Sequence, residues 1–309
     1  MKHFIDLADL RGPDLRGLLD DAHRRKAARK GWPKARPDAD RPLGDALLAM
    51  IFERPSTRTR VSFDAAMRQL GGQTIVLNST DLQLGRGETI EDTAKVLSRY
   101  VDAIMIRSSD HETVLRLRDT ATIPIVNGLT NLSHPCQILA DIETYEEHCG
   151  SIEGAVVAWC GDGDNNVARS WVHAAVRLGF TLRIACPEAF APDADLMAWA
   201  ETEGAPLSSV TVTRDAARAV DGADCVVTDT WVSMGDAQAE ERLTLLKPYQ
   251  ITQDLMARAA KHAIFLHCLP AYRGKEVTAE VLDGPQSVVF DEAENRIHAQ
   301  KAILNWCLS

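Results

Sequence analysis

The sequence predicts an α/β fold made of two doubly wound domains, each built on a parallel sheet and joined by interdomain helices. Short apolar runs typical of buried strands alternate along the chain with segments whose apolar residues fall at helical spacing. Such alternation is typical of βαβ units, in which helices cover both faces of a parallel sheet. The length of 309 residues is enough for two domains of ordinary size.

The first half of the chain shows this alternation clearly. A helix at 15–30 and a proline-containing loop at 31–44 come before it. The apolar run 46–52 is short enough to be a buried strand, and Val61, Ala65, Ala66 and Leu70 follow at helical spacing. The predicted elements are strand 46–52, helix 57–70, strand 74–78, helix 88–101, strand 103–107, helix 112–119, strand 124–126 and helix 134–148.

The second half repeats the pattern from residue 155. The predicted elements are strand 155–160, helix 166–178, strand 182–186, helix 194–203, strand 210–213, helix 214–220, strand 225–228, helix 252–262, strands 264–267 and 288–290, and a last helix at 293–307. We therefore expect a first domain at 1–133, an interdomain helix at 134–150 and a second domain at 151–290. The segment 291–309 is expected to be a C-terminal helix that returns to the first domain.

Composition and charge exclude several classes of protein. The net charge of −10 disfavours general nucleic-acid binding, and the basic run 23–30 is expected to be a solvated helix face. The N-terminus has no signal-peptide pattern and no apolar run is long enough to span a bilayer, so no membrane partner is expected. Seven cysteines without a C-x-x-C pair indicate a reducing cytoplasm and neither a disulfide framework nor a zinc knuckle.

The segment Ser56-Thr57-Arg58-Thr59-Arg60 is predicted to cradle a phosphate. It lies where a strand ends and a helix begins, so free backbone N–H groups and the positive end of the helix dipole meet there. Serine and threonine cap helices well, and arginine grips phosphate with two parallel hydrogen bonds. The alternative is a capped helix with a solvated basic first turn, but cations in a first turn oppose the dipole unless an anion is bound.

Polar residues also follow most of the other predicted strands, at the edge where open α/β sheets bind ligands. They occupy 78–87, 107, 127–137, 161–166, 229–235 and 267–270. Four side chains there have structural alternatives, namely a buried structural histidine for His134, a surface ion pair for Arg107, a turn cap for Asp229 and a small core residue for Cys268.

The turn Gly161-Asp162-Gly163-Asp164-Asn165-Asn166 resembles the start of a dinucleotide fingerprint. Asn166 replaces the third glycine, and Glu188 is a poor candidate for the acid that would bind the ribose. The fingerprint is therefore only partial, and an NAD site is the minority interpretation. At the start of its helix, Asn166 is suited either to cap the helix or to offer its amide to a ligand carboxylate.

Four separated motifs resemble those of the aspartate/ornithine carbamoyltransferase family, in order and over essentially the whole chain. The 56–60 segment and His134-Pro135-Cys136-Gln137 resemble the family's two carbamoyl-phosphate motifs. Asp229 with Ser233-Met234-Gly235, and His267-Cys268-Leu269-Pro270, resemble motifs of the ornithine-specific members. Glu294-Asn295-Arg296 also fits. Aspartate-specific members lack the Ser-Met-Gly loop and the cysteine after the histidine.

This resemblance implies transfer of the carbamoyl group of carbamoyl phosphate to the δ-amine of L-ornithine, which gives L-citrulline and phosphate in arginine metabolism. It implies that 1–133 binds carbamoyl phosphate and that 151–290 binds ornithine. The expected carbamoyl-phosphate contacts are Ser56, Thr57, Arg58, Thr59, Gln83, Arg107, His134, Gln137 and Arg296. The expected ornithine contacts are Asn166, Asp229, Ser233, Met234, Cys268 and Leu269. The expected catalytic residues are Arg107, His134, Asp229 and Cys268.

The resemblance also implies a homotrimer, in which the loop 78–87 brings Gln83 to a neighbouring subunit, and it implies no metal or organic cofactor. Three other functions stay open. One is a carbamoyltransferase for a related amine such as putrescine or an N-acylated ornithine. The second is a nucleotide-binding oxidoreductase resting on the 161–166 turn. The third is a protein that binds a phospho-metabolite without catalysis, which leaves Cys268 and Asp229 unexplained.

Overall fold

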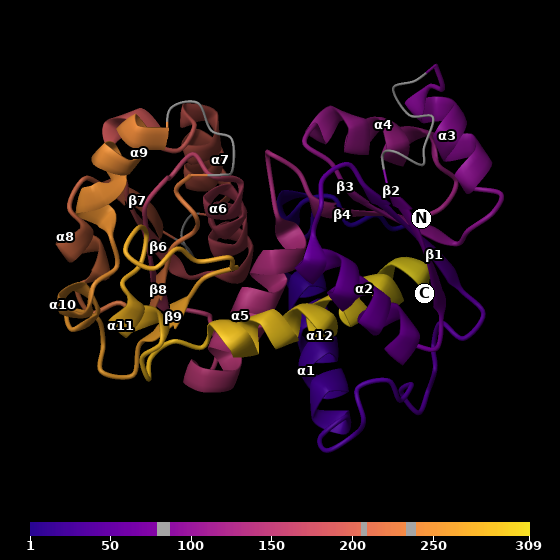
Figure 1. Cartoon of the computed structure of the whole chain (residues 1–309), viewed down its shortest axis with the longest axis horizontal. Helices are drawn as coiled ribbons and strands as arrows, with labels where there is room; N and C mark the ends of the chain where they lie inside the picture. Colours follow the sequence, from indigo (N-terminus) through magenta and orange to yellow (C-terminus); the bar gives the residue numbers. More distant parts are fainter. Residues whose placement is uncertain (79–86, 205–208, 233–238) are drawn as a thin grey trace. The chain divides into compact units, whose positions relative to one another are not determined.

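The structure, a computed structural model, describes residues 1–78, 87–204, 209–232 and 239–309. Two compact units make up the chain, with Met1–Ala140 and Glu294–Ser309 in unit 1 and Asp141–Ala293 in unit 2. Each unit has a parallel sheet flanked by helices (Figure 1), which confirms the predicted fold class. The unit boundaries fall inside helices α5 (Pro135–Cys149) and α12 (Val289–Leu308).

Unit 1 is built on a four-stranded sheet with the strand order β2-β1-β3-β4. Its strands are β1 (Leu47–Phe52), β2 (Gln73–Asn78), β3 (Ala103–Arg107) and β4 (Ile125–Leu129). The N-terminal segment extends the sheet, because Phe4 forms a parallel bridge with Val126 of β4. The inner strands β1 and β3 are buried on both faces, which explains their continuous apolar sequences.

Helices cover both faces of this sheet. They are α1 (Gly12–Ala28), α2 (Thr57–Gln69), α3 (Ile90–Leu97) and α4 (His111–Thr120), with a short 3₁₀ helix at Leu7–Asp9. Ala94 of α3 and Val114 of α4 pack with alternate strand residues such as Ile51 and Ile104. In Figure 1, α1, α2 and α12 lie on the opposite face from α3 and α4.

Unit 2 is built on a five-stranded sheet with the strand order β7-β6-β5-β8-β9. Its strands are β5 (Val156–Cys160), β6 (Thr181–Ala185), β7 (Ser209–Thr213), β8 (Cys225–Val227) and β9 (Ile264–Leu266). Its helices are α6 (Asn166–Leu178), α7 (Ala194–Gly204), α8 (Ala216–Val220), α9 (Ala239–Leu246), α10 (Gln253–Met256) and α11 (Ala279–Leu282), with 3₁₀ turns at Glu188–Phe190 and Lys247–Tyr249. One face packs α8, α10 and α11 against strand residues such as Ala158 and Phe265.

Two expectations about elements of the second half are wrong, and two short helices were not predicted. Residues 288–290 are not a strand but lie at the start of α12, where Asp291 and Glu292 favour a helix N-terminus over the local β-propensity. The predicted helix 252–262 ends as α10 at Met256, because Ala260 N–H donates to Ala223 O at 2.9 Å instead of continuing the helix. Helices α9 and α11 were not predicted, since both are too short to show a period.

The basic run at the end of α1 is only partly a solvated face. Arg25 and Arg29 are buried, and their guanidiniums lie 3.2 Å and 2.7 Å from the carboxylate of Asp38. The fully buried Lys301 of α12 lies 2.6 Å from the same carboxylate. Three cations therefore share one buried anion, and this cluster ties α12 to α1 and to the loop that carries Asp38.

Both sheets reverse their winding direction next to the first strand of the unit. In unit 1 the chain winds from β1 outward to β2 on one side and to β3 and β4 on the other, and in unit 2 the same reversal falls between β5 and β8. Ligands of open α/β sheets bind at such switch points, beyond the carboxyl ends of the strands.

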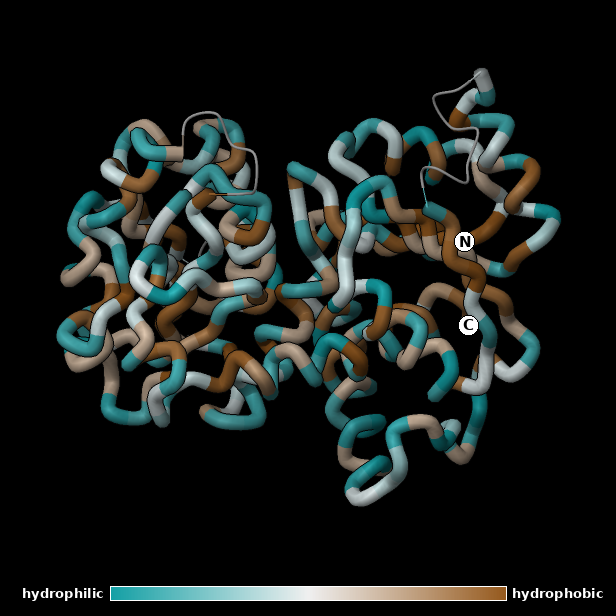
Figure 2. Tube along the Cα trace, in the orientation of Figure 1, coloured by the Kyte–Doolittle hydropathy of each residue, from teal (hydrophilic) through white to brown (hydrophobic). Residues whose placement is uncertain are grey.

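Hydrophobic residues concentrate along the strands (Figure 2). Among the described residues, no helix is long and apolar enough to cross a membrane.

Candidate functional site

The predicted phosphate-binding segment of unit 1, residues 56–60, lies where β1 passes into α2. Ser56 is the N-cap of α2, and its Oγ accepts a hydrogen bond from Thr59 N–H at 3.3 Å. Thr57 and Arg58 follow in the first turn and are exposed, and that turn contains no acidic residue. The free N–H groups and positive dipole end of α2 therefore face solvent together with the Arg58 guanidinium, as an anion site requires.

Thr59 connects three of the predicted site residues. Its fully buried Oγ1 accepts from Arg107 Nη1 at 3.0 Å and from Arg296 Nη2 at 2.8 Å. Arg296 also donates through Nη1 to Gln137 Oε1 at 2.6 Å. A hydroxyl oxygen has two lone pairs and one proton, so two donated bonds leave the proton of Thr59 for a third partner. The structure thus brings Thr59, Arg107, Gln137 and Arg296 together in unit 1.

His134 lies directly before α5 in the same unit and is almost fully buried. Burial, together with the cations Arg296, Arg107 and Arg58, holds the pKa of His134 well below its ordinary value. The imidazole is therefore neutral at physiological pH, and a neutral imidazole still carries one N–H donor.

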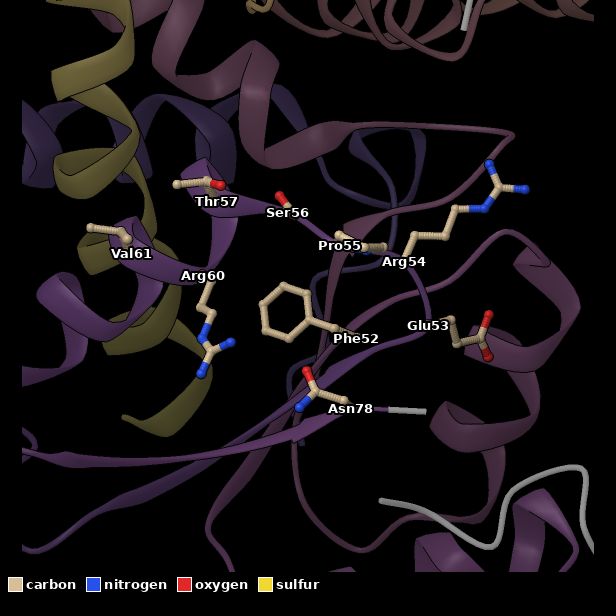
Figure 3. A pocket seen from close by; sticks show the side chains of 9 residues that line it. All are labelled: Phe52, Glu53, Arg54, Pro55, Ser56, Thr57, Arg60, Val61 and Asn78. Carbon is tan, nitrogen blue, oxygen red and sulfur yellow. The ribbon is translucent and has the colours of Figure 1, made fainter. Parts of the chain in front are cut away.

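A cavity of about 450 Å³ opens on the other side of the α2 N-terminus. Figure 3 shows the side chains of Phe52, Arg60 and Asn78 turned toward one another, with Ser56 and Thr57 above them in this view and Arg54 pointing away. Its volume is in the range of small-molecule sites. Arg60, the last residue of the sequence motif, therefore faces this cavity, whereas Thr59 faces the buried cluster of Arg107 and Arg296.

The predicted ornithine residues that the structure describes lie in unit 2, around Asp229. This residue follows β8, and its carboxylate accepts from Asn165 Nδ2 at 3.1 Å and from Cys268 Sγ at 3.0 Å. Burial and the neighbouring Asp229 carboxylate raise the pKa of the Cys268 thiol well above its ordinary value. Cys268 is thus a neutral thiol that donates to Asp229, and not a thiolate.

Asn166 is the first residue of α6 and not its cap. The capping role suggested as an alternative for Asn166 belongs to Asn165, whose Oδ1 accepts from Val167 N–H at 2.6 Å. Asn165 was missed because two adjacent asparagines at a helix start cannot be distinguished by sequence. The amide of Asn165 joins the turn after β5 to Asp229 after β8, across the switch point of unit 2.

Two further side chains that the sequence did not single out support these loops. Glu53 Oε2 accepts from Ser108 Oγ at 2.6 Å and from Ser109 N–H at 3.3 Å, and so joins the loops after β1 and β3. Arg242 of α9 donates to Trp231 O at 3.0 Å and also reaches Asp162 Oδ2. Arg242 gave no signal because the helix that carries it was not predicted.

Three predicted site residues, Gln83, Ser233 and Met234, lie outside the described residues, as does most of the loop 78–87.

The turn after β5 does not suit the pyrophosphate of a dinucleotide. Asp162 and Asp164 lie in it, and the N-terminus of α6 is capped by Asn165, which also holds Asp229. A Cβ at Gly161 would lie 3.0 Å from Trp231 Nε1, so the indole closes the turn from one side. A pyrophosphate would meet carboxylates where the Rossmann fingerprint offers free N–H groups.

Asp229, His267 and Cys268 also place a carboxylate, an imidazole and a thiol within 4.8 Å of one another. His267 Nδ1 already accepts from Leu269 N–H at 2.9 Å, and its Nε2 lies 3.4 Å from Glu276 Oε1. The imidazole of His267 is therefore turned toward protein partners. Of these three side chains, only the Cys268 thiol and the Asp229 carboxylate remain as possible metal ligands.

Comparison with known proteins relates both units of the chain to the family that its sequence motifs resemble. The model of the carbamoyl-P binding domain of aspartate/ornithine carbamoyltransferase matches residues 2–147, and that of the Asp/Orn binding domain matches residues 153–307. The chain is 61% identical over 306 residues to the ornithine carbamoyltransferase of Caulobacter vibrioides, covering 99% of this chain and 97% of that protein. It is 56% identical over 310 residues to that of Ruegeria pomeroyi, covering 100% and 99%.

Solved structures agree with these sequence matches. The ornithine carbamoyltransferase of Pyrococcus furiosus superposes with a TM-score of 0.92 at 48% identity, covering 98% of this chain and 96% of that one. The anabolic ornithine carbamoyltransferase of Campylobacter jejuni also gives a TM-score of 0.92, at 37% identity and 99% coverage of both chains. The chain therefore belongs to the aspartate/ornithine carbamoyltransferase family.

Proposed function

We propose that the chain transfers the carbamoyl group of carbamoyl phosphate to the δ-amine of L-ornithine and so produces L-citrulline and phosphate for arginine biosynthesis. The observation that carries this proposal is the cluster in which the Thr59 hydroxyl accepts from both Arg107 and Arg296, next to the exposed N-terminus of α2. In this proposal, unit 1 binds carbamoyl phosphate and unit 2 binds ornithine. The high identity to ornithine carbamoyltransferases supports this choice of substrates.

The phosphate of carbamoyl phosphate is assigned to the N-terminus of α2. Ser56, Thr57 and Thr59 offer hydroxyl and backbone N–H donors there, and Arg58 adds a guanidinium. Gln83, which lies outside the described residues, stays a predicted further contact. Charge-assisted hydrogen bonds of this kind are roughly twice as strong as neutral ones, and they also stabilise the phosphate that leaves.

The carbamoyl end is assigned to Thr59, Arg107, His134, Gln137 and Arg296. The δ-amine nitrogen attacks the carbamoyl carbon, and negative charge develops on the carbamoyl oxygen. The bond from carbon to the phosphate oxygen then breaks, and the leaving phosphate takes the proton that the attacking nitrogen loses. Arg107, the remaining proton of Thr59 and the neutral His134 supply donors for that oxygen. Donors held in place before the reaction need no reorganisation as the charge develops, which is the basis of oxyanion stabilisation.

Ornithine is assigned to the loops of unit 2. Asn166 is proposed to bind the carboxylate and Asp229 the α-ammonium, while Cys268 and Leu269 lie beside the δ-amine. Ser233 and Met234 stay predicted contacts outside the described residues. Since Cys268 is a neutral thiol that donates to Asp229, it cannot serve as the base that removes the amine proton. The amine therefore reacts as the free base, and the rate should rise with pH.

We also propose that the protein works as a homotrimer in the cytoplasm. Val61 of α2 lines the Figure 3 cavity and is 60% exposed. Ile75 is 44% exposed and lies on the edge strand β2, whose last residue, Asn78, also lines that cavity. Exposed apolar side chains on a sheet edge favour a contact with another subunit. All seven cysteines are free, which is compatible with a reducing compartment.

The direct test is a citrulline assay with the purified full chain and carbamoyl phosphate. Ornithine, putrescine and N-acetylornithine are compared as acceptors under the same conditions. We expect turnover with ornithine and little with the other two, because each lacks a free α-amino-acid group for Asp229 and Asn166. Turnover of putrescine or N-acetylornithine in preference to ornithine would overturn the proposed acceptor, and no turnover with any amine would overturn the proposed reaction.

A further inference from the structure

The turn that carries Cys268 contains a buried pair that the proposed chemistry does not use. His267 follows β9 directly and is fully buried, as is Glu276. His267 N–H donates to Glu292 Oε2 at 2.8 Å, which fixes the backbone where the strand ends. Both side chains of the buried pair have protein partners, and the proposed function assigns neither of them a contact with substrate.

The hydrogen bonds of His267 determine where its ring proton lies. Nδ1 accepts from Leu269 N–H at 2.9 Å, and an accepting nitrogen carries no proton. The proton of the neutral imidazole is therefore on Nε2, and Nε2 lies 3.4 Å from Glu276 Oε1. A carboxylate at that distance favours this tautomer and this ring orientation, as carboxylate partners of functional histidines commonly do.

Glu276 is itself held in place. Its Oε1 accepts from Tyr272 N–H, and its backbone oxygen accepts from Ile251 N–H at 2.9 Å. The Glu276 carboxylate thus lies between His267, at the start of the turn, and the backbone of Tyr272 further along it.

The backbone next to Cys268 adopts a conformation that needs such support. Leu269 has φ +57°, a left-handed conformation that residues other than glycine, asparagine and aspartate rarely adopt. Conformations of this kind persist only where the surrounding structure enforces them, and they cluster at functional sites. The bond from Leu269 N–H to His267 Nδ1 spans Cys268, and it therefore fixes the direction in which Cys268 Sγ reaches Asp229.

We propose that His267, oriented by Glu276, is a positioning residue that holds the Cys268–Leu269 backbone in the conformation required to bind ornithine. The inference rests on the proposed function for its kinetic consequence. Its structural part, the Nε2–H tautomer and the direction of Cys268, holds whatever the acceptor is.

Two substitutions separate the two contacts of the imidazole. In His267→Asn the amide oxygen can take the place of Nδ1 and keep the bond to Leu269 N–H, whereas in His267→Gln the amide reaches the place of Nε2 and that bond is lost. We expect His267→Gln to raise the KM for ornithine by about 10–100-fold with little change in the KM for carbamoyl phosphate. His267→Asn should stay within a few-fold of wild type for both substrates.

A matched pair of controls separates this role from a general loss of structure. Glu276→Gln keeps an acceptor for the Nε2 proton and should remain close to wild type. His262→Gln removes an exposed imidazole that lies 3.0 Å from Asp224 in the same unit, and it should change neither KM. A His267→Asn variant as impaired as His267→Gln would overturn the proposal, since it would show that the acceptor at Nδ1 does not matter.

Two measurements do not depend on catalysis. The ¹⁵N NMR signals of the His267 imidazole in the full-length wild-type protein should show a protonated Nε2 and an unprotonated Nδ1, and the opposite tautomer would overturn the proposal. Alkylation of Cys268 by iodoacetamide should change in His267→Gln but not in His267→Asn, and equal rates in both variants would also contradict it. If the wild-type chain makes no citrulline while these two results hold, the proposed reaction fails and the positioning role stands.

Discussion

Thr59 is the side chain through which the two guanidiniums of unit 1 meet. Arg107 is the last residue of β3 and Arg296 lies on α12, yet both donate to the same buried oxygen. Because both lone pairs of Oγ1 are used, the direction of its proton is set before any substrate binds. A hydroxyl fixed in this way loses less orientational freedom on binding than a serine or threonine on the surface, which explains why a buried threonine occupies the first turn of α2.

Replacing Arg58 by alanine tests the anion cradle at the scale of one residue. The change removes a charge-assisted phosphate contact worth roughly 1.5–3 kcal/mol, so carbamoyl phosphate should bind about 10–150-fold more weakly by calorimetry. Arg68→Ala is the matched control, because Arg68 lies at the other end of α2 and pairs with Asp64 on the surface. Equal affinities for wild type and Arg58→Ala would show that the phosphate binds elsewhere.

The helix α12 supplies unit 1 with two buried cations. Besides Arg296, it carries Lys301, whose Nζ lies 2.9 Å and 2.6 Å from the two carboxylate oxygens of Asp38. Burial lowers the pKa of Lys301 although Asp38 opposes the shift, whereas the surrounding cations lower the pKa of Asp38 against the effect of burial. The two groups also differ in their partners, because the Asp38 carboxylate contacts three cations, whereas the Lys301 ammonium contacts that one carboxylate and the amide oxygen of Gln69.

This asymmetry predicts a small effect on stability for one member of the pair and a large loss for the other. Lys301→Met leaves Asp38 compensated by Arg25 and Arg29, so the free energy of unfolding should change by no more than about 1 kcal/mol. Asp38→Asn leaves three buried cations without their shared anion and should cost about 3–5 kcal/mol. Urea denaturation of both variants measures the difference. A larger loss for Lys301→Met than for Asp38→Asn would contradict this account of the cluster.

His298, also on α12, makes the stability of unit 1 depend on pH. Burial and the cations Lys301, Lys26 and Arg29 lower its pKa to about 3. Between that value and an ordinary unfolded pKa of about 6.5, the unfolded chain binds a proton that the folded chain does not, so stability falls as pH falls. The slope is up to about 1.4 kcal/mol per pH unit for this group, and neutral His134 adds to it in the same direction.

The measurement is the free energy of unfolding in urea at several values from about pH 5 to about pH 8. His298→Gln should flatten the curve below about pH 6, whereas His148→Gln, which removes an exposed imidazole of unit 2, should leave it unchanged. Parallel curves for wild type and His298→Gln would mean that His298 does not stay neutral in the folded protein.

Local sequence signals determine the bounds of some elements, whereas contacts with distant residues determine those of others. β1 and α2 were predicted to within one residue because a continuous apolar run and a serine cap are local signals. The end of α10 was not, since it depends on a contact with distant backbone, the hydrogen bond from Ala260 N–H to Ala223 O. Likewise the motifs identified Thr59 and Arg296, but their contact joins residues far apart in sequence and only the fold reveals it.

At the scale of the whole molecule, both units place their candidate residues by the same rule. In unit 1, Thr59 lies in the helix after β1 and Arg107 ends β3, and these two strands flank the switch point. In unit 2, Asn165 and Asp229 follow the two strands that flank it. Each unit therefore offers one polar cluster at the carboxyl edge of its sheet. An enzyme with two dissimilar substrates gains from this arrangement, because each cluster can be specific for one of them.

The proposed trimer makes a quantitative prediction about shared sites. Gln83→Ala and Arg107→Ala homotrimers should each be impaired. If Gln83 acts on the neighbouring subunit, random mixing in equal amounts gives about one quarter of sites with both an intact Arg107 and an intact Gln83. Dissociated and reassociated mixtures should then recover about a quarter of wild-type activity. A mixture no more active than its parents would show that each site is built from one chain.

The division of unit 1 into two segments has a consequence during protein synthesis. Its second segment, Glu294–Ser309, is translated only after the whole of unit 2, Asp141–Ala293. At about 5–20 residues per second the ribosome needs roughly 8–30 s to translate unit 2, and the first segment waits during that time without α12. Arg296 and Lys301 arrive together at the end, so the nascent chain acquires an arginine of the proposed carbamoyl site in the same event that brings Lys301 to Asp38. Every incomplete chain therefore lacks the hydrogen bond from Arg296 to Thr59.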